Sequence, residues 1–351
     1  MREFKPYPLV LTPILRPKVW GGDALRRFGK PVGDQRIGES WELADLDRTS
    51  ASGGGGEAAH TIIKNGAMTG ETVRGAMDAW GERMLGKAER IGGGFPLLVK
   101  YLDAREHLSI QIHPSTAYAH KHPDAHLKTE SWYVLEAQPG AVIYAGLKDG
   151  VDEAAMRSAI ENGTVPEIMR THPAVPGECW TLESGTVHAL GAGVVVAEVQ
   201  TPSDTTFRVY DWAREYGRGG RELHIEQAIE CASFAPPPEP MRADLGLSAH
   251  GDPMGGPPKM GSRTTRIAET AFYRMDAVSA SCASVDLGGD GGSPMVVMFP
   301  RTMGASIASE SDAFSEVVVE AGQTVLIPAA CAESAVLRAG PGTEAVVGRV
   351  R

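Results

Sequence analysis

The chain has 351 residues, a formal net charge of -10 and a composition that is 42% hydrophobic. This length predicts about two domains with a substantial core, and the acidic balance without any basic run argues against nucleic acid as a partner. No stretch of about 18 consecutive apolar residues occurs, so neither a membrane-spanning helix nor a membrane partner is expected.

The N-terminal stretch MREFKPYPLVLTPIL contains proline and charge where a signal peptide needs an unbroken apolar core. The four cysteines are far apart in the sequence and form no CxxC pair, which is typical of a reduced intracellular protein. We therefore expect a cytoplasmic protein.

Many short strands and turns are predicted, because 42 glycines and 24 prolines are spread among short apolar runs. One amphipathic helix is expected from Thr69 to about Gly86, with Thr69 as its N-cap, since Val73, Met77 and Trp80 recur at helical spacing. The other expected elements are helices over 151–161, 165–171 and 222–232, and strands over 96–102, 108–113, 130–136, 140–144, 178–183, 193–200 and 205–212. The helices are interpreted as additions to a β core.

A break in composition divides the chain into two predicted domains, 1–235 and 264–351. The stretch 236–263, which contains PPPEP and GDPMGGPPKMGS, offers almost nothing that could pack and is expected to be a linker. Two segments of the chain have a similar sequence pattern, which suggests a duplicated architecture: GECWTLESGTVH, which starts at Gly177, and GQTVLIPAACAE, which starts at Gly322. In this alignment Glu333 takes the place of His188, so the second domain is predicted to bind no metal.

Four polar residues form the main candidate for a functional site. In LSIQIHP the alternate side chains of a strand share a face, so Gln111 and His113 point the same way. Glu130 lies in the next strand-like run, KTESWYVL, and the turn in ESGTVHAL can return His188 to the same place. Two imidazoles, an amide and a carboxylate suit Zn²⁺ or a similar divalent ion, with room for water or substrate.

A second cluster, His120, His122 and His126, also has a spacing that could suit a metal. It lies among charged and turn-forming residues in an expected surface loop, so the first set is preferred as the functional site.

At the first set the chain resembles the type I mannose-6-phosphate isomerases, or phosphomannose isomerases, of the cupin superfamily, and in length it is similar to their compact bacterial branch. The strings that carry the resemblance are FPLLVKYLDAREHLSIQIHP, LKTESWYVL, ESGTVHALG and AEVQTPSDTTFRVYDW, with the early WGG and GESWELA. The resemblance implies a mainly β fold of two cupin barrels, or double-stranded β-helices, with a few added helices. The metal ligands of the family match Gln111, His113, Glu130 and His188.

The resemblance further implies a metal-dependent aldose-ketose isomerase that interconverts mannose 6-phosphate and fructose 6-phosphate through an enediol. One Zn²⁺ per chain is expected, and other divalent metals are compatible with the ligand set. Such an enzyme moves a proton between adjacent carbons and must stabilise negative charge on an enediolate oxygen. The residues expected to act on the substrate are three candidate bases, Lys128, Glu198 and Asp204, an anion-binding Arg208, and two phosphate-pocket residues, Lys100 and Ser109.

Structural roles stay open for several of these residues. Glu198 could be a paired carboxylate at a barrel rim, and Asp204 could be a turn or capping residue. Lys100 could extend from a strand end without binding a ligand. Arg208 could form an ion pair with Asp211 or Glu215.

Two other functions also stay open. One is a non-catalytic cupin that binds a sugar phosphate, and the other is a metal cupin oxygenase, which would favour three histidines and iron. The expected partner is a small sugar phosphate, and both a monomer and a homodimer are compatible with the sequence.

Overall fold

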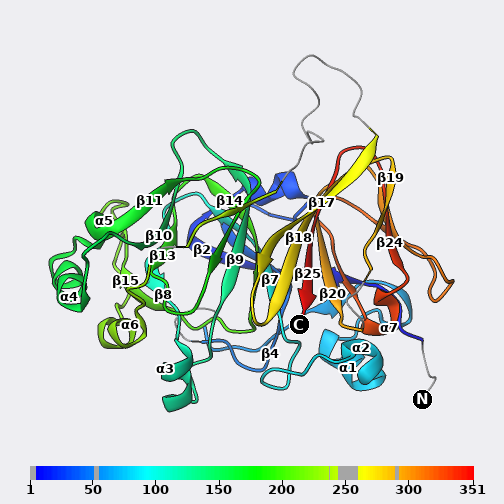
Figure 1. Cartoon of the computed structure of the whole chain (residues 1–351), viewed down its shortest axis with the longest axis horizontal. Coiled ribbons are helices and arrows are strands. Elements are labelled where there is room, and N and C mark those ends of the chain that lie inside the picture. Colours follow the sequence, from blue (N-terminus) through cyan, green and yellow to red (C-terminus); the bar gives the residue numbers. More distant parts are fainter. Residues whose placement is uncertain (1–4, 51–54, 237, 244–259, 289–291) are drawn as a thin grey trace.

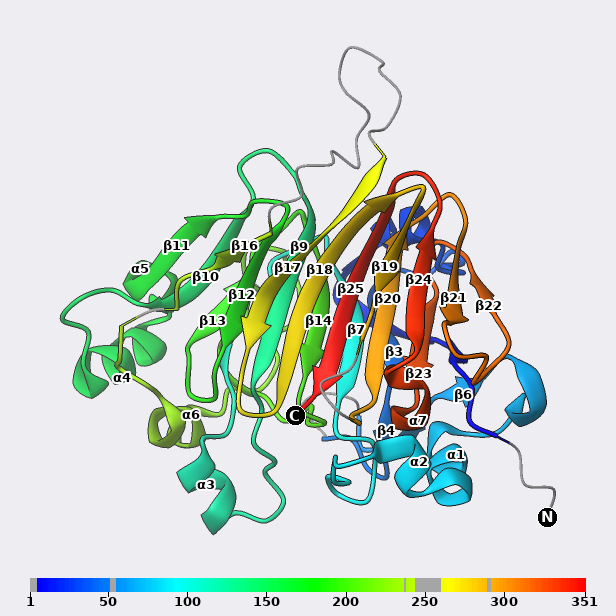
Figure 2. The same cartoon turned by 45° about the vertical axis from the view of Figure 1, so that its right-hand side comes forward.

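The structure of the chain, a computed structural model, describes residues 5–50, 55–236, 238–243, 260–288 and 292–351. It is mainly β with a few helices, as predicted, and four antiparallel sheets form successive layers (Figure 1 and Figure 2). Within these residues no helix has the length and apolar character needed to cross a membrane. All four cysteines are free thiols.

The first and second sheets face each other across the candidate site. The first sheet has the strand order β11 (Met169–Pro173), β10 (Val142–Leu147), β13 (His188–Leu190), β8 (Ile110–Ile112) and β15 (Phe207–Tyr210). The second sheet has the order β16 (Met241–Arg242), β12 (Glu178–Leu182), β9 (Glu130–Ala137), β14 (Val194–Gln200), β7 (Leu98–Ala104), β3 (Ile37–Leu43) and β2 (Ile14–Gly22).

The third and fourth sheets contain most of the C-terminal strands. The third has the order β17 (Gly261–Glu269), β18 (Tyr273–Ser281), β25 (Thr343–Val350), β20 (Met295–Arg301), β23 (Thr324–Ile327), β1 (Leu9–Thr12) and β6 (Ile62–Ile63). The fourth has the order β19 (Ala283–Asp286), β24 (Ala335–Ala339), β21 (Ala305–Ser309) and β22 (Val317–Val319), and a small sheet pairs β4 (Asp45–Leu46) with β5 (Ala59–His60).

Helices cover the ends and outer faces of these sheets (Figure 1). They are α1 (Val73–Trp80), α2 (Glu82–Leu85), α3 (Thr116–Lys121), α4 (Glu153–Asn162), α5 (Val165–Ile168), α6 (Ile225–Cys231) and α7 (Ala329–Ala332), with 3₁₀ turns η1 (Ala24–Phe28) and η2 (Gly66–Met68). Helices α4 and α6 pack their apolar residues on the outer face of the first sheet.

The second sheet is buried on both faces, which explains why β9 has an almost continuous apolar run. Alternate residues of a strand point to opposite faces. Trp132 and Val134 accordingly join the core between the first and second sheets. Tyr133 and Leu135 join the core between the second and third sheets. The polar Glu130 at the start of β9 shares the side of Trp132 and so faces the first sheet.

The long predicted helix differs from the structure in its start and its continuity. Thr72, rather than Thr69, is the N-cap of α1, and its hydroxyl accepts a hydrogen bond from the Gly75 N–H at 3.0 Å. Gly81, with φ of 53°, then separates α1 from α2. Thr69 instead follows the 3₁₀ turn η2. Thr69 and Thr72 are three residues apart and either could be an N-cap, so the sequence did not fix the first residue of the helix.

Strand pairing crosses the expected division of the chain at two places. Strand β1 pairs with β23, with Leu9 opposite Leu326, so the first strand lies in a sheet of C-terminal strands. Within the expected linker, β16 pairs with β12, and β17 already begins at Gly261. Positions 237 and 244–259 of that linker lie outside the described residues. The domain boundary near 235 stays a prediction.

Candidate active site

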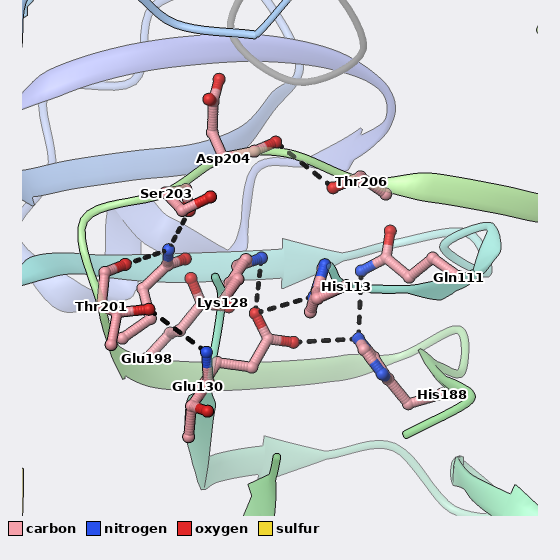
Figure 3. A network of polar contacts seen from close by, with 12 residues as sticks. Gln111, His113, Lys128, Glu130, His188, Glu198, Thr201, Ser203, Asp204 and Thr206 are labelled. Atoms are coloured by element: carbon pink, nitrogen blue, oxygen red, sulfur yellow. Dashed lines mark hydrogen bonds and ion pairs between the residues drawn. The ribbon is translucent and has the colours of Figure 1, made fainter. Parts of the chain in front are cut away.

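Three of the expected metal ligands converge in the space between the first and second sheets (Figure 3). His113 directly follows β8, Glu130 opens β9 and His188 opens β13, so each lies at a strand end. His188 Nε2 is 3.0 Å from Glu130 Oε1, and His113 Nε2 is 3.3 Å from Glu130 Oε2. One ligand atom from each residue lies within 4.8 Å of the other two, and all three side chains are fully buried.

Gln111, the fourth expected ligand, lies beside this group. It is directly opposite His188 in the β8–β13 ladder, and its Nε2 is 3.3 Å from His188 Nε2. A half-turn of the amide about its last bond would present its oxygen, the atom that binds a metal, at the same place. The structure thus brings together all four side chains that the sequence analysis selected.

The hydrogen bonds around this cluster fit a bound cation. His113 Nδ1 is 3.1 Å from the Thr205 carbonyl, and His188 Nδ1 is 2.8 Å from the Thr186 carbonyl. Each Nδ1 must therefore carry the proton, which leaves both Nε2 lone pairs facing the Glu130 carboxylate. His113 Nε2 and both Glu130 oxygens are buried and make no hydrogen bond of good geometry with any described residue. Lone pairs that face one another in this way repel, and a positive ion between them would remove the repulsion.

Burial and the Lys128 charge keep these ligands in the protonation state that a metal needs. Burial, followed by the positive charge of Lys128, lowers the pKa of His113 to about 3, so its imidazole is neutral at neutral pH. Burial would raise the pKa of Glu130, but its contacts, above all the positive charge of Lys128, hold that pKa well below its usual range. The Lys128 Nζ lies 2.6 Å from Glu130 Oε2.

A pocket of about 590 Å³, including its open mouth, lies beside the cluster. Its lining includes every other residue selected from the sequence: Lys100, Ser109, Lys128, Glu198, Asp204 and Arg208. It also includes six polar or aromatic residues that the sequence analysis did not select: Lys18, Trp20, Glu39, Trp132, Thr206 and Arg221. Trp20 and Glu39 lie in WGG and GESWELA, so the strings that carried the family resemblance already contained a signal for them.

Glu39 is an ionised carboxylate that lines this pocket. It lies 3.4 Å from Lys18 Nζ and accepts a hydrogen bond from the Trp41 indole at 2.5 Å. Burial would raise the pKa of Glu39, but the charges of Lys18 and Lys100 outweigh it and hold the pKa at about 2.

Lys100 is bound to protein groups on more than one side. Its Nζ lies 2.9 Å from Glu198 Oε1 and donates to Gln200 Oε1 at 2.8 Å. Burial would lower the pKa of Lys100, but the neighbouring Glu198 outweighs it and raises that pKa. The side chain is buried rather than directed to solvent, and its charge is already compensated. The other oxygen of Glu198, Oε2, accepts a hydrogen bond from the Trp132 indole at 2.8 Å.

Arg208 lies opposite Gln111 in the β8–β15 ladder and has no carboxylate within ion-pair distance among the described residues. The alternative partner Asp211 instead binds Arg218 and Arg221, at 3.2 and 2.8 Å. Arg208 Nη1 donates to the Glu222 carbonyl at 2.8 Å, and its buried Nε has no hydrogen-bond partner in the part of the chain that the structure describes. Burial and the neighbouring Arg221 lower the pKa of Arg208 to about 10. A cation in this position attracts an anionic ligand.

Asp204 has a structural contact besides its place at the pocket. Its carboxylate oxygens accept from the Ser50 N–H at 2.8 and 3.0 Å, and its carbonyl accepts from the Ser50 hydroxyl at 3.0 Å. This carboxylate therefore helps to hold the chain at Ser50. These bonds join residues far apart in the sequence, so they form a tertiary contact rather than the local turn that the sequence left open for Asp204.

The competing histidines do not form a metal group. His120 lies in α3 rather than in the expected loop, and the ring of His122 stacks on Tyr118 with centroids 4.0 Å apart. Across the part of the chain that the structure describes, the group of His113, Glu130 and His188 is the one set of three such side chains close enough to share an ion.

The sequence of this chain matches a family model and several known relatives. Residues 9–145 match the family model described as the catalytic domain of type I phosphomannose isomerase. The mannose-6-phosphate isomerase ManA of Bacillus subtilis is 36% identical over 236 residues, which cover 66% of this chain and 70% of that protein. A mannose-6-phosphate isomerase of Streptococcus mutans is 36% identical over 242 residues, covering 68% of this chain and 72% of that protein.

Solved structures confirm the expected fold class over almost the whole chain. The mannose 6-phosphate isomerase structure from Bacillus subtilis aligns with a TM-score of 0.76 and 24% identity, covering 97% of this chain and 99% of that one. A zinc-bound mannose 6-phosphate isomerase aligns with a TM-score of 0.66 and 16% identity, also covering 97% of this chain and 99% of that one.

Proposed function

The chain belongs to the type I phosphomannose isomerase family, and from this membership we propose that it interconverts mannose 6-phosphate and fructose 6-phosphate with one Zn²⁺ bound per chain. The observation that carries the proposal is the convergence of His113, Glu130 and His188 on one point beside a pocket with several basic side chains. Because the substrate carries a phosphate, a basic pocket favours its binding.

We propose that Gln111, His113, Glu130 and His188 hold the ion. These ligands include one carboxylate and no second negative group, so the centre keeps a formal charge of about +1. When bound, a zinc ion supplies Lewis acidity that polarises the sugar carbonyl and stabilises negative charge on its oxygen. Two neutral imidazoles and a carboxylate are common zinc ligands, whereas the oxygenase alternative would favour three histidines.

We propose that Glu198 moves the proton between C1 and C2 of the sugar. Its carboxylate lines the pocket, and contacts with Lys100 and Trp132 fix its orientation. Arg208, which has no carboxylate partner within the described residues, is assigned to the enediolate oxygens or the phosphate. Lys128, bound to Glu130, orients that ligand and faces the substrate.

The phosphate group of the substrate requires positive charge that no protein carboxylate fully compensates. Arg221 and Arg218 share the carboxylate of Asp211, and Arg218 also lies 3.7 Å from Glu106, so the uncompensated positive charge at the pocket, among the described residues, is that of Arg208. Lys100 is already paired with Glu198, so we assign Lys100 to that carboxylate and leave the phosphate to the arginines and Ser109.

An assay before and after metal removal tests this function. The purified chain loaded with Zn²⁺ should convert mannose 6-phosphate to fructose 6-phosphate, a chelator should abolish turnover, and added Zn²⁺ should restore it. Unphosphorylated mannose is the control substrate and should react far more slowly. Full activity in protein shown to be metal-free would contradict the mechanism. A thermal shift with mannose 6-phosphate but no product would instead support the non-catalytic alternative.

We further propose that the protein acts in the cytoplasm. Four cysteines that are free thiols, three of them buried, are compatible with a reducing compartment. Activity recovered from a cytoplasmic fraction of cells that express the chain would support this location.

A further inference from the structure

Five large or charged side chains form a row across the second sheet. Directly opposed residues of neighbouring strands continue from β3 to β12, and in order they are Trp41, Lys100, Glu198, Trp132 and Trp180. Each is at most 4% exposed, so the whole row is buried. Directly opposed residues share a face of the sheet, and their side chains therefore lie next to one another.

Contacts within this row reach both oxygens of Glu198, one through an ion pair and the other through a hydrogen bond. Oε1 lies 2.9 Å from Lys100 Nζ, and Oε2 accepts the Trp132 indole N–H at 2.8 Å. Lys100 Nζ also lies 5.3 Å from the centre of the Trp41 ring. A carboxylate held by a different partner at each oxygen has little freedom to rotate.

Trp132 also contacts a proposed metal ligand. Its ring meets the His188 ring edge to face, with centroids 5.3 Å apart and an interplanar angle of 77°. One rigid indole therefore contacts Glu198 through its N–H and His188 through its ring. Both ends of this contact belong to the active site.

We propose that Trp132 is a positioning residue that sets the orientation of Glu198 relative to the metal ligand His188. The inference rests on the proposed isomerase function and on Glu198 as the proton-transferring group. Packing alone would not require an indole here, because phenylalanine also fills apolar space. The N–H is needed only for the carboxylate.

Trp180 provides a matched comparison within the same row. It is opposite Trp132 in the β9–β12 ladder and is also fully buried. Its indole nitrogen, however, has no hydrogen-bond partner among the described residues, and the side chain does not line the active-site pocket. Replacing either tryptophan by phenylalanine removes the same atoms, but only one replacement removes a hydrogen bond to Glu198.

The test compares Trp132→Phe with Trp180→Phe in the zinc-loaded full chain. Trp132→Phe should lower kcat about 10- to 100-fold with KM changed by less than about threefold, because small displacements of a reacting group are costly while substrate binding is kept. Exchange of the transferred sugar proton with solvent should slow by a similar factor. Trp180→Phe should keep kcat within about threefold of the wild type, and both variants should bind one zinc per chain.

Equal losses of kcat in the two variants would overturn the proposal, as would a Trp132→Phe defect confined to zinc content or KM. If Trp132→Phe does not fold, Trp132 can be replaced by 3-benzothienylalanine, which keeps the ring shape and exchanges the N–H for sulfur. Wild-type kcat in that protein would equally overturn the proposal. A wild-type chain without isomerase activity would instead reject the proposed function.

Discussion

The geometry separates the three candidate bases. Lys128 is bound to the proposed metal ligand Glu130 at 2.6 Å, and Asp204 accepts hydrogen bonds from Ser50. Glu198 lines the pocket with both oxygens oriented by fixed partners. A base needs a carboxylate that can reach the substrate in one orientation, and Glu198 meets this condition best.

Replacing Glu198 by Gln should therefore lower kcat about 10²- to 10⁴-fold, the usual contribution of a general acid-base group. The amide has nearly the same shape, so zinc content should not change. Steady-state assays with metal analysis measure both quantities. Glu230→Gln, which alters an exposed pair with Lys121, is the matched control and should keep normal kcat. Substantial activity in Glu198→Gln would move the role to Lys128 or Asp204.

At the residue scale, the sequence selected the side chains that converge at the candidate site, but it missed several of their neighbours. Gln111, His113, Glu130 and His188 lie in motifs that are distinctive in themselves. Arg221 was missed because its place at the pocket depends on Asp211, ten positions earlier. The partner of Lys100 was also missed, since Glu198 is opposite it only when β7 pairs with β14.

The segment that follows β15 is held by one carboxylate. Asp211 accepts from the Arg221 side chain at 2.8 Å, from the Arg221 backbone N–H at 2.8 Å and from Arg218 at 3.2 Å. Burial would raise the pKa of Asp211, but these hydrogen bonds and charges outweigh it and hold the pKa at about 2. This contact keeps the segment with Arg221 at the edge of the pocket.

The contribution of Asp211 to stability should depend on pH. Its folded-state pKa of about 2 lies below the ordinary value of 3.8, so the carboxylate stabilises the fold fully above about pH 4. That stabilisation is lost as the pH falls toward 2. After allowance for solvent near Arg221, we expect about 1 to 2 kcal/mol.

Urea unfolding of the wild type and Asp211→Asn at several pH values measures this contribution. The difference in unfolding free energy should be constant above about pH 4 and shrink as the pH falls from there toward 2. A difference that does not change over this range would contradict the assignment. Exposed Asp78, paired with Arg90, is the control position, and Asp78→Asn should show a smaller difference throughout.

At the element scale, most strands near the site were predicted, and the helix boundaries were less accurate. The expected strand 193–200 corresponds to β14, and 130–136 corresponds to β9, because apolar runs bounded by turn residues mark strands well. The helix 116–121 was missed because its six residues are too few to show a helical period. Its N-cap, Ser115, was the available local signal.

Across the whole molecule, a buried ion pair joins the second and third sheets. Lys30 Nζ lies 2.6 Å from Glu42 Oε2 on β3, and it also contacts the Gly322 carbonyl. The Thr324 hydroxyl of β23 donates to the same Glu42 oxygen at 2.9 Å. Both charged side chains are at most 2% exposed. This network ties the sheet that holds the active site to the C-terminal strands.

Replacing Lys30 by Met should destabilise the whole chain by about 3 to 5 kcal/mol, because Glu42 would stay buried without its counter-charge. Chemical denaturation of the folded chain measures the effect. Lys121→Met breaks an exposed ion pair with Glu230 and is the matched control, for which no measurable change is expected. A Lys30→Met chain with wild-type stability would show that this ion pair does not hold the sheets together.

The sequence by itself determined the mainly β class, the family resemblance and the four metal-ligand candidates. Alternation along single strands and turn residues are local properties, so they can be read without a structure. Only the tertiary structure decided that β1 joins the C-terminal strands, that Lys100 pairs with Glu198 and that Trp132 bonds the same carboxylate. These contacts depend on which strands lie side by side, and strand order is set by burial across the whole core rather than by any local pattern.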